Sequence, residues 1–347
     1  MTPQSALNPV DALTRLNDLV TAFCQSQTFF AACNMGVFDE LHQGSSTAED
    51  LAAQLKIHPI GCRRMLVALA EMGLVDRENG FYKNSALGAF CTATSPVRLG
   101  ALSAWQHPWY QMWQYLPDAL REYSPRWQQA LGASANETWA PLYANPAALR
   151  EFAHFMNAMS VPQGKVIAEQ FDFTPFRCVM DVAGGPGGIA LELGRRFPHL
   201  HGIVMDMAPV CAVAEEYIQS GGLTGRFTTA AGDMFHPPYP QGADVIVLGH
   251  VLHDWSDERG REILRNCFAA LPEHGVLLVV EKVLNHDYSS STFTLMKDLT
   301  MLIGCESGAR ERTEAEYRGL LHETGFRIDR LIRLDAPRDL IVARKAS

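Results

Sequence analysis

Three residues that lie far apart in the sequence have the types needed to remove a proton from a hydroxyl group: His253, Glu281 and Glu311. His253 follows the apolar run 244–248, and Glu281 directly follows the apolar run 275–280. If both runs are parallel strands, their carboxyl ends face one ligand crevice, so the histidine and the first carboxylate are expected there together. A carboxylate on one ring nitrogen leaves the other nitrogen free as a base. Each residue also has an explanation that involves no catalysis: His253 as a surface histidine, Glu281 as a solvated strand end, and Glu311 as an acid that favours a helix N-terminus.

A glycine-rich turn marks a candidate cofactor site. Residues 181–188 read Asp-Val-Ala-Gly-Gly-Pro-Gly-Gly and stand between a strand-like run (178–182) and a helical pattern (189–197). Glycines at such a turn remove the Cβ atoms that would hold a ligand away from the backbone. Acids also follow the next two strand-like runs, 201–205 and 226–230, at the sheet edge where nucleotide-type cofactors bind. The candidate residues are Asp181, Gly184, Gly185, Gly187, Asp206, Asp233 and Met234.

The spacing alone allows two kinds of cofactor. Residues 185–190 read Gly-Pro-Gly-Gly-Ile-Ala, and Asp206 lies 21 residues after Gly185, which also satisfies the dinucleotide fingerprint. NAD is disfavoured because the motif lies at mid-chain behind a separate helical region, and Asp181 stands where that fingerprint requires nothing. An acid after each of three successive strands suits a ligand with an ammonium group, a ribose diol and an adenine. S-adenosylmethionine has all three, and the remaining alternative is a glycine turn in an ordinary α/β protein.

Composition excludes several classes of protein. The chain has 347 residues, of which 47% are apolar and 19% charged, enough for a large core and for two domains. Its net charge of −9 disfavours nucleic acid and anionic membranes as partners. Eight scattered cysteines without a C-x-x-C pair predict reduced thiols and no metal site. No signal peptide and no apolar run approaching 18 residues are found, so we expect a cytoplasmic protein without a membrane span.

The chain is expected to divide into three parts, 1–100, 101–165 and 166–347. Residues 11–42 read as helices with much apolar surface, which favours burial against a partner chain over packing within the chain. Residues 46–90 show a helix, a turn, a second helix and a β-hairpin, which is a winged-helix pattern. Its five basic residues are matched by five acidic ones, so a structural role is favoured over DNA binding.

The second and third parts are expected to hold the substrate and the cofactor. In 101–165 the residues Trp105, Trp109 and Trp113 recur on one face of a helix, as a core stripe or as the wall of a flat pocket. From residue 178 strands and helices alternate, which predicts a doubly wound α/β sheet with an antiparallel strand at its edge. The candidate pocket residues are Trp105, Trp109, Phe155, Met159, His250, Asp254 and Met301.

Four motifs carry a resemblance to a known family. They are residues 16–18 (Leu-Asn-Asp), 30–39 (Phe-Ala-Ala-Cys-Asn-Met-Gly-Val-Phe-Asp), 251–255 (Val-Leu-His-Asp-Trp) and 311–313 (Glu-Arg-Thr). The chain resembles, from about residue 12 to 345, the small-molecule O-methyltransferases typified by plant caffeate and flavonoid enzymes and by bacterial enzymes of antibiotic biosynthesis. It is especially similar to the acetylserotonin type.

The resemblance implies a fold and a cofactor. The fold would be a Rossmann-like class I methyltransferase sheet with an antiparallel edge strand, preceded by a mostly helical winged-helix domain that interlocks with a second copy in a homodimer. The glycine loop and Asp206 would hold the methionine moiety and the ribose of S-adenosylmethionine. Asp233 and Met234 would hold the adenine, and Ser160 would reach the cofactor carboxylate.

The resemblance also implies the catalytic residues. His253 matches the family's base, and Glu281 and Glu311 match the acids that flank it. Two positions depart from the pattern: Gly249 replaces a lysine found in many relatives, and His250 replaces an arginine of the acetylserotonin type. Substrate identity therefore does not carry over.

These observations together predict a homodimeric, S-adenosylmethionine-dependent O-methyltransferase that acts on a hydroxyl of a small aromatic or heteroaromatic molecule, with His253 as general base. N-methylation of a heteroaromatic ring is the nearest alternative, because a ring nitrogen needs no base. A non-methylating reaction on the same fold and a ligand-sensing DNA-binding regulator are the other two.

Overall fold

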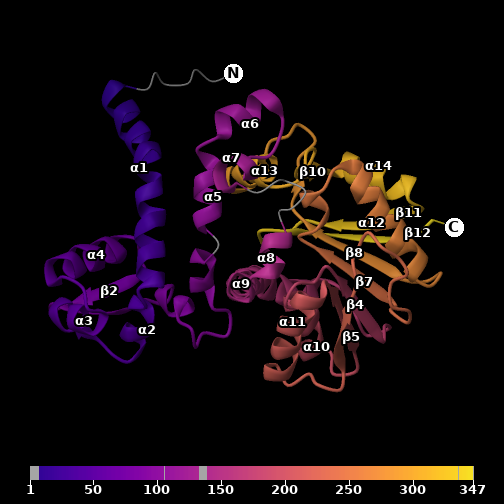
Figure 1. Cartoon of the computed structure of the whole chain (residues 1–347), viewed down its shortest axis with the longest axis horizontal. Helices are drawn as coiled ribbons and strands as arrows, with labels where there is room; N and C mark the ends of the chain where they lie inside the picture. Colours follow the sequence, from indigo (N-terminus) through magenta and orange to yellow (C-terminus); the bar gives the residue numbers. More distant parts are fainter. Residues whose placement is uncertain (1–7, 105, 133–138, 335, 347) are drawn as a thin grey trace. The chain divides into compact units, whose positions relative to one another are not determined.

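The computed structural model describes residues 8–104, 106–132, 139–334 and 336–346. The chain forms two compact units, Met1–Ala104 and Trp105–Ser347 (Figure 1). All eight cysteines lie in the described ranges, and all are free thiols. No helix among the described residues is long and apolar enough to cross a membrane.

The first unit contains the predicted winged helix. Its elements are α1 (Pro9–Asn34), α2 (Val37–His42), β1 (Ser46–Thr47), α3 (Ala48–Leu55), α4 (Pro59–Glu71), β2 (Val75–Glu78), β3 (Phe81–Asn84), η1 (Gly88–Cys91) and η2 (Leu99–Ser103). The strands form an antiparallel sheet in the order β1-β3-β2. Asn79 and Gly80 join β2 to β3 with positive φ angles of 50° and 85°, which is why this turn needs such residues. The core contains the buried side chains of Phe38, Leu51, Leu66 and Tyr82.

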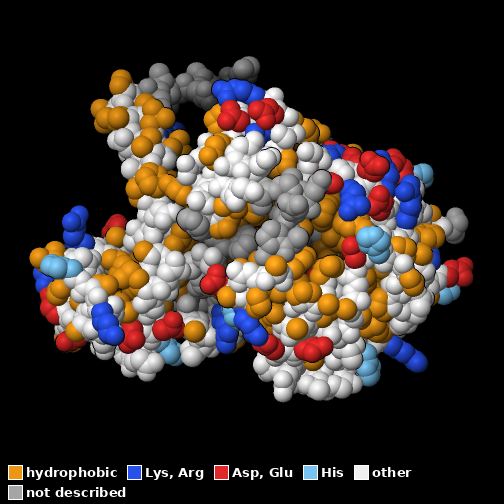
Figure 2. Space-filling view, viewed as in Figure 1, with side chains coloured by type: hydrophobic (Ala, Val, Ile, Leu, Met, Phe, Trp, Pro, Cys, Tyr) orange, Lys and Arg blue, Asp and Glu red, His pale blue; other side chains and the backbone are white. Residues whose placement is uncertain are grey.

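Helix α1 carries a long apolar surface that the rest of the first unit does not cover. Leu13, Leu16, Leu19 and Phe23 recur every three or four residues and are between 51% and 73% exposed. Ala32 is the one residue of α1 that is buried within the chain. Figure 2 shows hydrophobic side chains gathered along this helix. A contiguous apolar surface of this kind is typical of a protein–protein interface.

The second unit is built on a seven-stranded sheet with the order β11-β12-β8-β7-β4-β5-β6. Its strands are β4 (Cys178–Val182), β5 (His201–Asp206), β6 (Phe227–Ala231), β7 (Val245–Gly249), β8 (Val276–Glu281), β11 (Phe326–Ile332) and β12 (Asp339–Lys345). Strands β4 to β8 pair in parallel, and β12 pairs antiparallel with both β8 and β11. The predicted antiparallel strand is therefore present as β12, one strand in from the edge that β11 forms.

Helices cover both faces of this sheet, as the alternation within its strands requires. Helices α9 (Pro146–Gln170), α10 (Gly188–Arg196) and α11 (Ala208–Ser220) pack on one face, which includes Val179, Val247 and Leu278. Helices α12 (Asp257–Ala270) and α14 (Glu314–Glu323) pack on the other, which includes Met180 and Leu277. Helix α14 begins with the capping box that Thr313 and Glu316 form.

The second unit has further α-helices, several of which carry tryptophan or tyrosine side chains. They are α5 (Gln106–Trp113), α6 (Leu116–Glu122), α7 (Trp127–Leu131), α8 (Ala140–Ala144) and α13 (Thr292–Gly304). Met112, Trp127 and Ile303 form a small core in which Trp109 and Trp113 are partly buried. Of the predicted tryptophan stripe, Trp113 is thus a core residue, and Trp105 lies outside the described residues.

Candidate active site

A cavity of about 410 Å³ opens at the carboxyl ends of β4 to β7, between these strands and helices α9 and α13. Most of the residues that the sequence singled out line it. They are Ser160, Gly184, Gly185, Asp206, Asp233 and Met234 of the candidate cofactor set, and Trp109, Phe155, Met159, His250, His253, Asp254 and Met301 of the candidate substrate and catalytic sets. Sequence segments that are up to 196 residues apart, from Trp109 to Cys305, thus meet in one cavity.

The glycine loop between β4 and α10 turns sharply. Ala183, Gly185 and Gly187 have positive φ angles of 53°, 57° and 83°, a conformation that glycine adopts without strain. A Cβ at Gly184 would lie 2.7 Å from the carboxyl carbon of Asp181, so the loop lies directly on that side chain.

Asp181, in β4, and Gly187, the last residue of the loop before α10, are not among the residues that line the cavity. Asp181 is buried, and its carboxylate accepts a hydrogen bond of 3.4 Å from the backbone N–H of Ala190 in α10. Burial raises the pKa of Asp181 to about 7. The expectation that these two residues bind the cofactor stays a prediction.

Close helix packing brings Ser160 to the glycine loop. A Cβ at Gly188 would lie 2.7 Å from the Cβ of Ser160, and one at Gly164 would lie 2.8 Å from the Cβ of Glu192. Only glycine at these positions lets α9 approach α10 so closely. Ser160 therefore faces the cavity beside the loop, although it precedes the loop by more than twenty residues.

Two further acids hold the loops that follow β5 and β6. Asp206 accepts hydrogen bonds from the backbone N–H groups of Gly185 at 2.8 Å and Met207 at 2.7 Å. Burial nevertheless raises the pKa of Asp206 to about 6. Asp233 accepts a hydrogen bond from the backbone N–H of Phe235 at 2.9 Å. Both carboxylates line the cavity at neighbouring strand ends.

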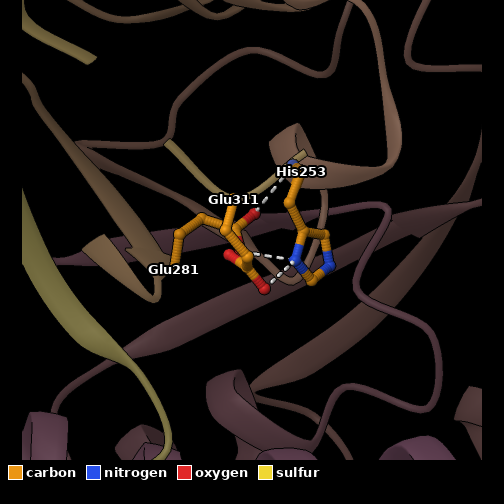
Figure 3. Close-up of side chains that lie close together, drawn as sticks. All are labelled: His253, Glu281 and Glu311. Atoms are coloured by element: carbon orange, nitrogen blue, oxygen red, sulfur yellow. Dashed lines mark hydrogen bonds and ion pairs between the residues drawn. The ribbon is translucent and has the colours of Figure 1, made fainter. Parts of the chain in front are cut away.

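The predicted histidine and its two acids come together, and Figure 3 shows their side chains. Nδ1 of His253 lies 3.1 Å from Oε1 of Glu311 and 3.3 Å from Oε2 of Glu281. Glu281 also accepts backbone hydrogen bonds from Val251 at 2.9 Å and from His253 at 3.4 Å. Nε2 lies 3.4 Å from Oδ1 of Asp254. The histidine is thus held through Nδ1 and through its backbone, while Nε2 lies toward the cavity side that Asp254 lines.

A short parallel ladder places the two glutamates side by side. β9 (Val283–Leu284) pairs with β10 (Arg312–Thr313), with Arg312 opposite Val283. Glu281 ends β8 just before β9, and Glu311 immediately precedes β10, so the ladder brings both carboxylates to His253. This pairing joins segments about thirty residues apart, and the sequence pattern did not predict it.

The electrostatics of this buried group favour a charged histidine. Burial alone would lower the pKa of His253, but the three carboxylates beside it outweigh that effect and raise the pKa above its usual value. Burial would likewise raise the pKa of Glu311, yet His253 and Arg338 lower it. Burial raises the pKa of Glu281. The arrangement makes His253 a stronger base than a free imidazole, because an imidazolium is stabilised where it forms.

Two cationic residues of the site were missed by the sequence analysis. Arg338 is 1% exposed, and its Nη1 donates to Oε1 of Glu311 at 3.0 Å while its Nε donates to Nδ1 of His250 at 3.1 Å. Lys297, from α13, lines the cavity with its Nζ 5.9 Å from the ring centroid of Trp109. No role was assigned to Arg338 from the sequence. The sequence feature that could have identified it is its position directly before β12, in which Asp339 lies opposite Glu281 in the pairing with β8.

The donor atoms of His253, Glu281 and Glu311 lie within 4.8 Å of one another, a spacing that a metal ion could also use. Nδ1 of His253 is already hydrogen-bonded to Glu311, and the guanidinium of Arg338 lies on that same carboxylate. A second cation there would meet the permanent charge of Arg338 at close range. The group therefore fits a hydrogen-bonded base better than a metal centre.

One antiparallel strand, β12, lies between β8 and β11, and the loops that line the cavity follow the carboxyl ends of the parallel strands. This architecture is that of a class I methyltransferase. The model of an O-methyltransferase domain matches residues 113–327, and that of an O-methyltransferase dimerisation domain matches residues 17–94. The chain therefore belongs to the O-methyltransferase family with an N-terminal dimerisation domain.

Individual relatives agree with this assignment. The chain is 32% identical to a 3-hydroxy-5-methyl-1-naphthoate 3-O-methyltransferase of Streptomyces sahachiroi, over 93% of this chain and 92% of that one. It is 35% identical to the acetylserotonin O-methyltransferase of Mus musculus molossinus, over 95% and 88%. The solved structure of human N-acetylserotonin methyltransferase with S-adenosylmethionine superimposes with a TM-score of 0.90 at 28% identity, covering 99% of this chain and 100% of that one. The chain is thus an S-adenosylmethionine-dependent O-methyltransferase of the acetylserotonin and natural-product type.

Proposed function

We propose that this enzyme methylates a hydroxyl group on a small aromatic or heteroaromatic molecule and that His253 is its general base. The observation that carries this proposal is the placement of His253: Nδ1 is hydrogen-bonded to the buried carboxylate of Glu311 and lies 3.3 Å from that of Glu281, and the histidine is among the residues that line the cavity. Nε2 then accepts the proton of the substrate hydroxyl, and Glu281 and Glu311 stabilise the imidazolium that results. General-base assistance of this kind is typically worth about 10²–10⁴-fold in rate.

The cavity residues fit S-adenosylmethionine. When bound, it supplies a methyl group on a sulfonium, so that an O–CH₃ bond forms as the S–CH₃ bond breaks. Asp206 would bind the ribose hydroxyls, Asp233 and Met234 the adenine, and Ser160 the carboxylate, while the backbone of the glycine loop (183–186) would lie against the methionine moiety. The fit rests on this loop, where a Cβ at Gly184 would meet Asp181, and on acids at two successive strand ends.

The substrate side of the cavity suits a flat molecule. Trp109, Phe155, Met159 and Met301 provide aromatic and thioether surfaces, which pack well against planar rings. Asp254 lies next to the proposed base and would contact the reacting edge of the substrate. A largely apolar lining with a few polar groups excludes water from the reacting oxygen and positions it.

We further propose that the protein acts as a homodimer, with α1 as the main contact between subunits. The exposed apolar face of α1 and the matched dimerisation domain, residues 17–94, support this. In this view residues 1–100 serve assembly, 101–165 contribute to the substrate pocket, and 166–347 bind the cofactor.

Mass spectrometry of the reaction products tests the central proposal. Purified protein and its His253→Ala variant are incubated with S-adenosylmethionine and a panel of phenols, hydroxyindoles and hydroxylated heteroaromatics. The expected result is a product heavier by one CH₂ group that the variant loses, while calorimetry shows unchanged cofactor binding. Full activity of the variant would remove His253 from the mechanism, and a mild loss with a nitrogen-methylated product would favour N-methylation.

A further inference from the structure

We propose that His250 is a specificity residue that donates a hydrogen bond from Nε2 to the substrate, and that the substrate is a hydroxyarene with a carbonyl or carboxylate oxygen on the same edge of its ring system as the reacting hydroxyl. This inference rests on the proposed function and concerns the same cavity. Three observations support it. A hydrogen bond from Arg338 fixes the tautomer of His250, this tautomer leaves the N–H at Nε2 without an acceptor, and the proposed base His253 lies beside it.

Arg338 determines which nitrogen of His250 carries the proton. A guanidinium has donors and no acceptor, and its Nε lies 3.1 Å from Nδ1 of His250 in a hydrogen bond. Nδ1 must therefore be the acceptor, so the neutral ring is protonated at Nε2. Burial lowers the pKa of His250 well below its usual value, and the charge of Arg338 lowers it further. His250 thus stays neutral, with an N–H at Nε2.

This N–H group has no hydrogen-bond acceptor among the described residues. His250 is among the residues that line the cavity and is 8% exposed; its Nε2 atom is buried, and no described residue accepts a hydrogen bond from it. Buried donors are almost always paired in native proteins. The backbone of His250 also has a φ of 59°, which is uncommon for a residue other than glycine, and such conformations concentrate at functional sites. Both features point to a ligand as the missing partner.

The two histidines present opposite groups. His253 donates from Nδ1 to Glu311, which leaves its Nε2 as an acceptor for the substrate hydroxyl. His250 accepts at Nδ1 from Arg338, which leaves its Nε2 as a donor. The ring centroids are 6.2 Å apart. A ligand that satisfies both rings therefore carries a hydroxyl and an acceptor oxygen close together on one edge.

Lys297 indicates that this acceptor can carry a negative charge. It lines the cavity, and no carboxylate of the described residues lies within ion-pair distance of its Nζ. Arg338 is already paired with Glu311, so among the described residues that line the cavity Lys297 is the basic side chain left for a ligand. Burial lowers the pKa of Lys297, and a bound anion would favour its charged form. A carboxylate beside the hydroxyl could then use both His250 and Lys297, whereas a carbonyl would use His250 alone.

The tautomer can be measured without any substrate. Long-range proton–nitrogen spectra of the enzyme with nitrogen-15-labelled imidazoles are recorded with S-adenosylhomocysteine bound, and the His250 signals are assigned from the His250→Asn variant. The expected pattern at neutral pH is a protonated Nε2 and an unprotonated Nδ1, which disappears in Arg338→Met. A protonated Nδ1 in the wild-type enzyme would overturn the proposal.

Matched ligands test the recognition itself. Binding is followed by tryptophan fluorescence, and turnover by methyl transfer, for ortho- against para-hydroxyacetophenone and for salicylate against para-hydroxybenzoate. The ortho member of each pair should be favoured about tenfold in the wild-type enzyme, which is the size expected for one good hydrogen bond. His250→Asn should abolish both preferences, because asparagine tolerates the left-handed backbone and can accept from Arg338 but is too short to reach as Nε2 does. Lys297→Met should weaken salicylate alone if the charge is recognised.

Each outcome bears on the inference separately from the proposed function. Methyl transfer to phenols without an ortho preference, or a preference that survives in His250→Asn, would overturn the inference and leave the proposed function standing. An ortho preference in binding with no methyl transfer to any phenol would support the inference and count against the proposed function. Failure of both ortho compounds to bind at millimolar concentration would count against the inference.

Discussion

Arg338 and Glu311 form a fully buried ion pair, with 3.0 Å between Nη1 of the guanidinium and Oε1 of the carboxylate. The same Oε1 accepts the hydrogen bond from Nδ1 of His253 at 3.1 Å. One oxygen atom thus joins a permanent cation to the proposed base. His253 and Arg338 together lower the pKa of Glu311 in a site where burial alone would raise it, so Glu311 stays ionised.

Arg338→Met is expected to lower the free energy of unfolding by about 3–5 kcal/mol, because it leaves a buried carboxylate without its partner. It should also raise the pKa of His253, since a positive charge near the imidazolium is lost. Urea denaturation measures the first effect, and the pH dependence of kcat/KM measures the second.

The matched control for this change is Arg318→Met. Arg318 pairs with Glu314 on the surface, where the two side chains are 57% and 43% exposed. Surface pairs contribute about 0–1 kcal/mol, so this variant should be nearly as stable as the wild type. If both variants lost the same free energy of unfolding, loss of the buried Arg338 pair would be no more destabilising than loss of a surface pair.

The pH dependence of the reaction should show the effect of the carboxylates on His253. A base must be neutral to accept a proton, so activity rises with pH through the pKa of His253, and that pKa is raised in the folded enzyme. We therefore expect the acid limb of kcat/KM above the usual histidine pKa of about 6.5. Glu281→Gln removes one of the charges that raise this pKa, so the limb should move to lower pH and the plateau should fall.

Glu273→Gln serves as the control, because Glu273 is exposed on the loop before β8. Its pH profile should coincide with that of the wild-type enzyme. If the limb of Glu281→Gln moved to higher pH or stayed in place, the carboxylate of Glu281 would not stabilise the imidazolium.

Asp206 and Asp181 should differ in their importance for the cofactor. Asp206 lines the cavity, whereas Asp181 is not among the residues that line it. Asp206→Asn should weaken binding of S-adenosylhomocysteine in calorimetry by about tenfold or more, since a charged acceptor for hydroxyl groups is lost. Asp181→Asn should have a smaller effect, because its carboxyl group has a pKa of about 7 and its contact is with the backbone of Ala190.

The same residue predicts a pH effect on cofactor affinity. The pKa of Asp206 is raised to about 6, so its carboxylate is protonated as the pH falls through that value. A protonated carboxyl group is a poorer acceptor, and affinity should therefore decrease below about pH 6. Asp206→Asn should lack this decrease, and an equal decrease in the variant would assign it to another group.

The sequence predicted those features that local patterns determine. Apolar runs of five or six residues gave strands β4 to β8 within one residue, and the glycine turn marked the cavity, because both depend on neighbours along the chain. The positions of His253 and Glu281 at one sheet edge followed from strand direction alone. These are rules that a linear pattern can express.

The features that were missed depend on contacts between distant segments. Arg338 reaches Glu311 and His250 because β12 lies directly beside β8. The pattern of apolar residues does not predict this strand order. The ladder of β9 with β10 has only two residues in each strand, too few for an alternating pattern. The place of Asp181 in the motif is clear from the sequence, but only the fold of the loop shows that Gly184 packs directly on its side chain.

The exposed face of α1 gives the last prediction. Leu16 and Leu19 are 59% and 73% exposed, and transfer of such side chains from water to an interface contributes about 25 cal/mol for each Å² of apolar area. The double variant Leu16→Ser, Leu19→Ser should therefore shift the enzyme from dimer to monomer in sedimentation or light-scattering measurements. Gln25→Glu, at an exposed polar position of the same helix, should remain a dimer. If the double variant stayed dimeric at nanomolar concentration, the contact between subunits would lie elsewhere on the chain.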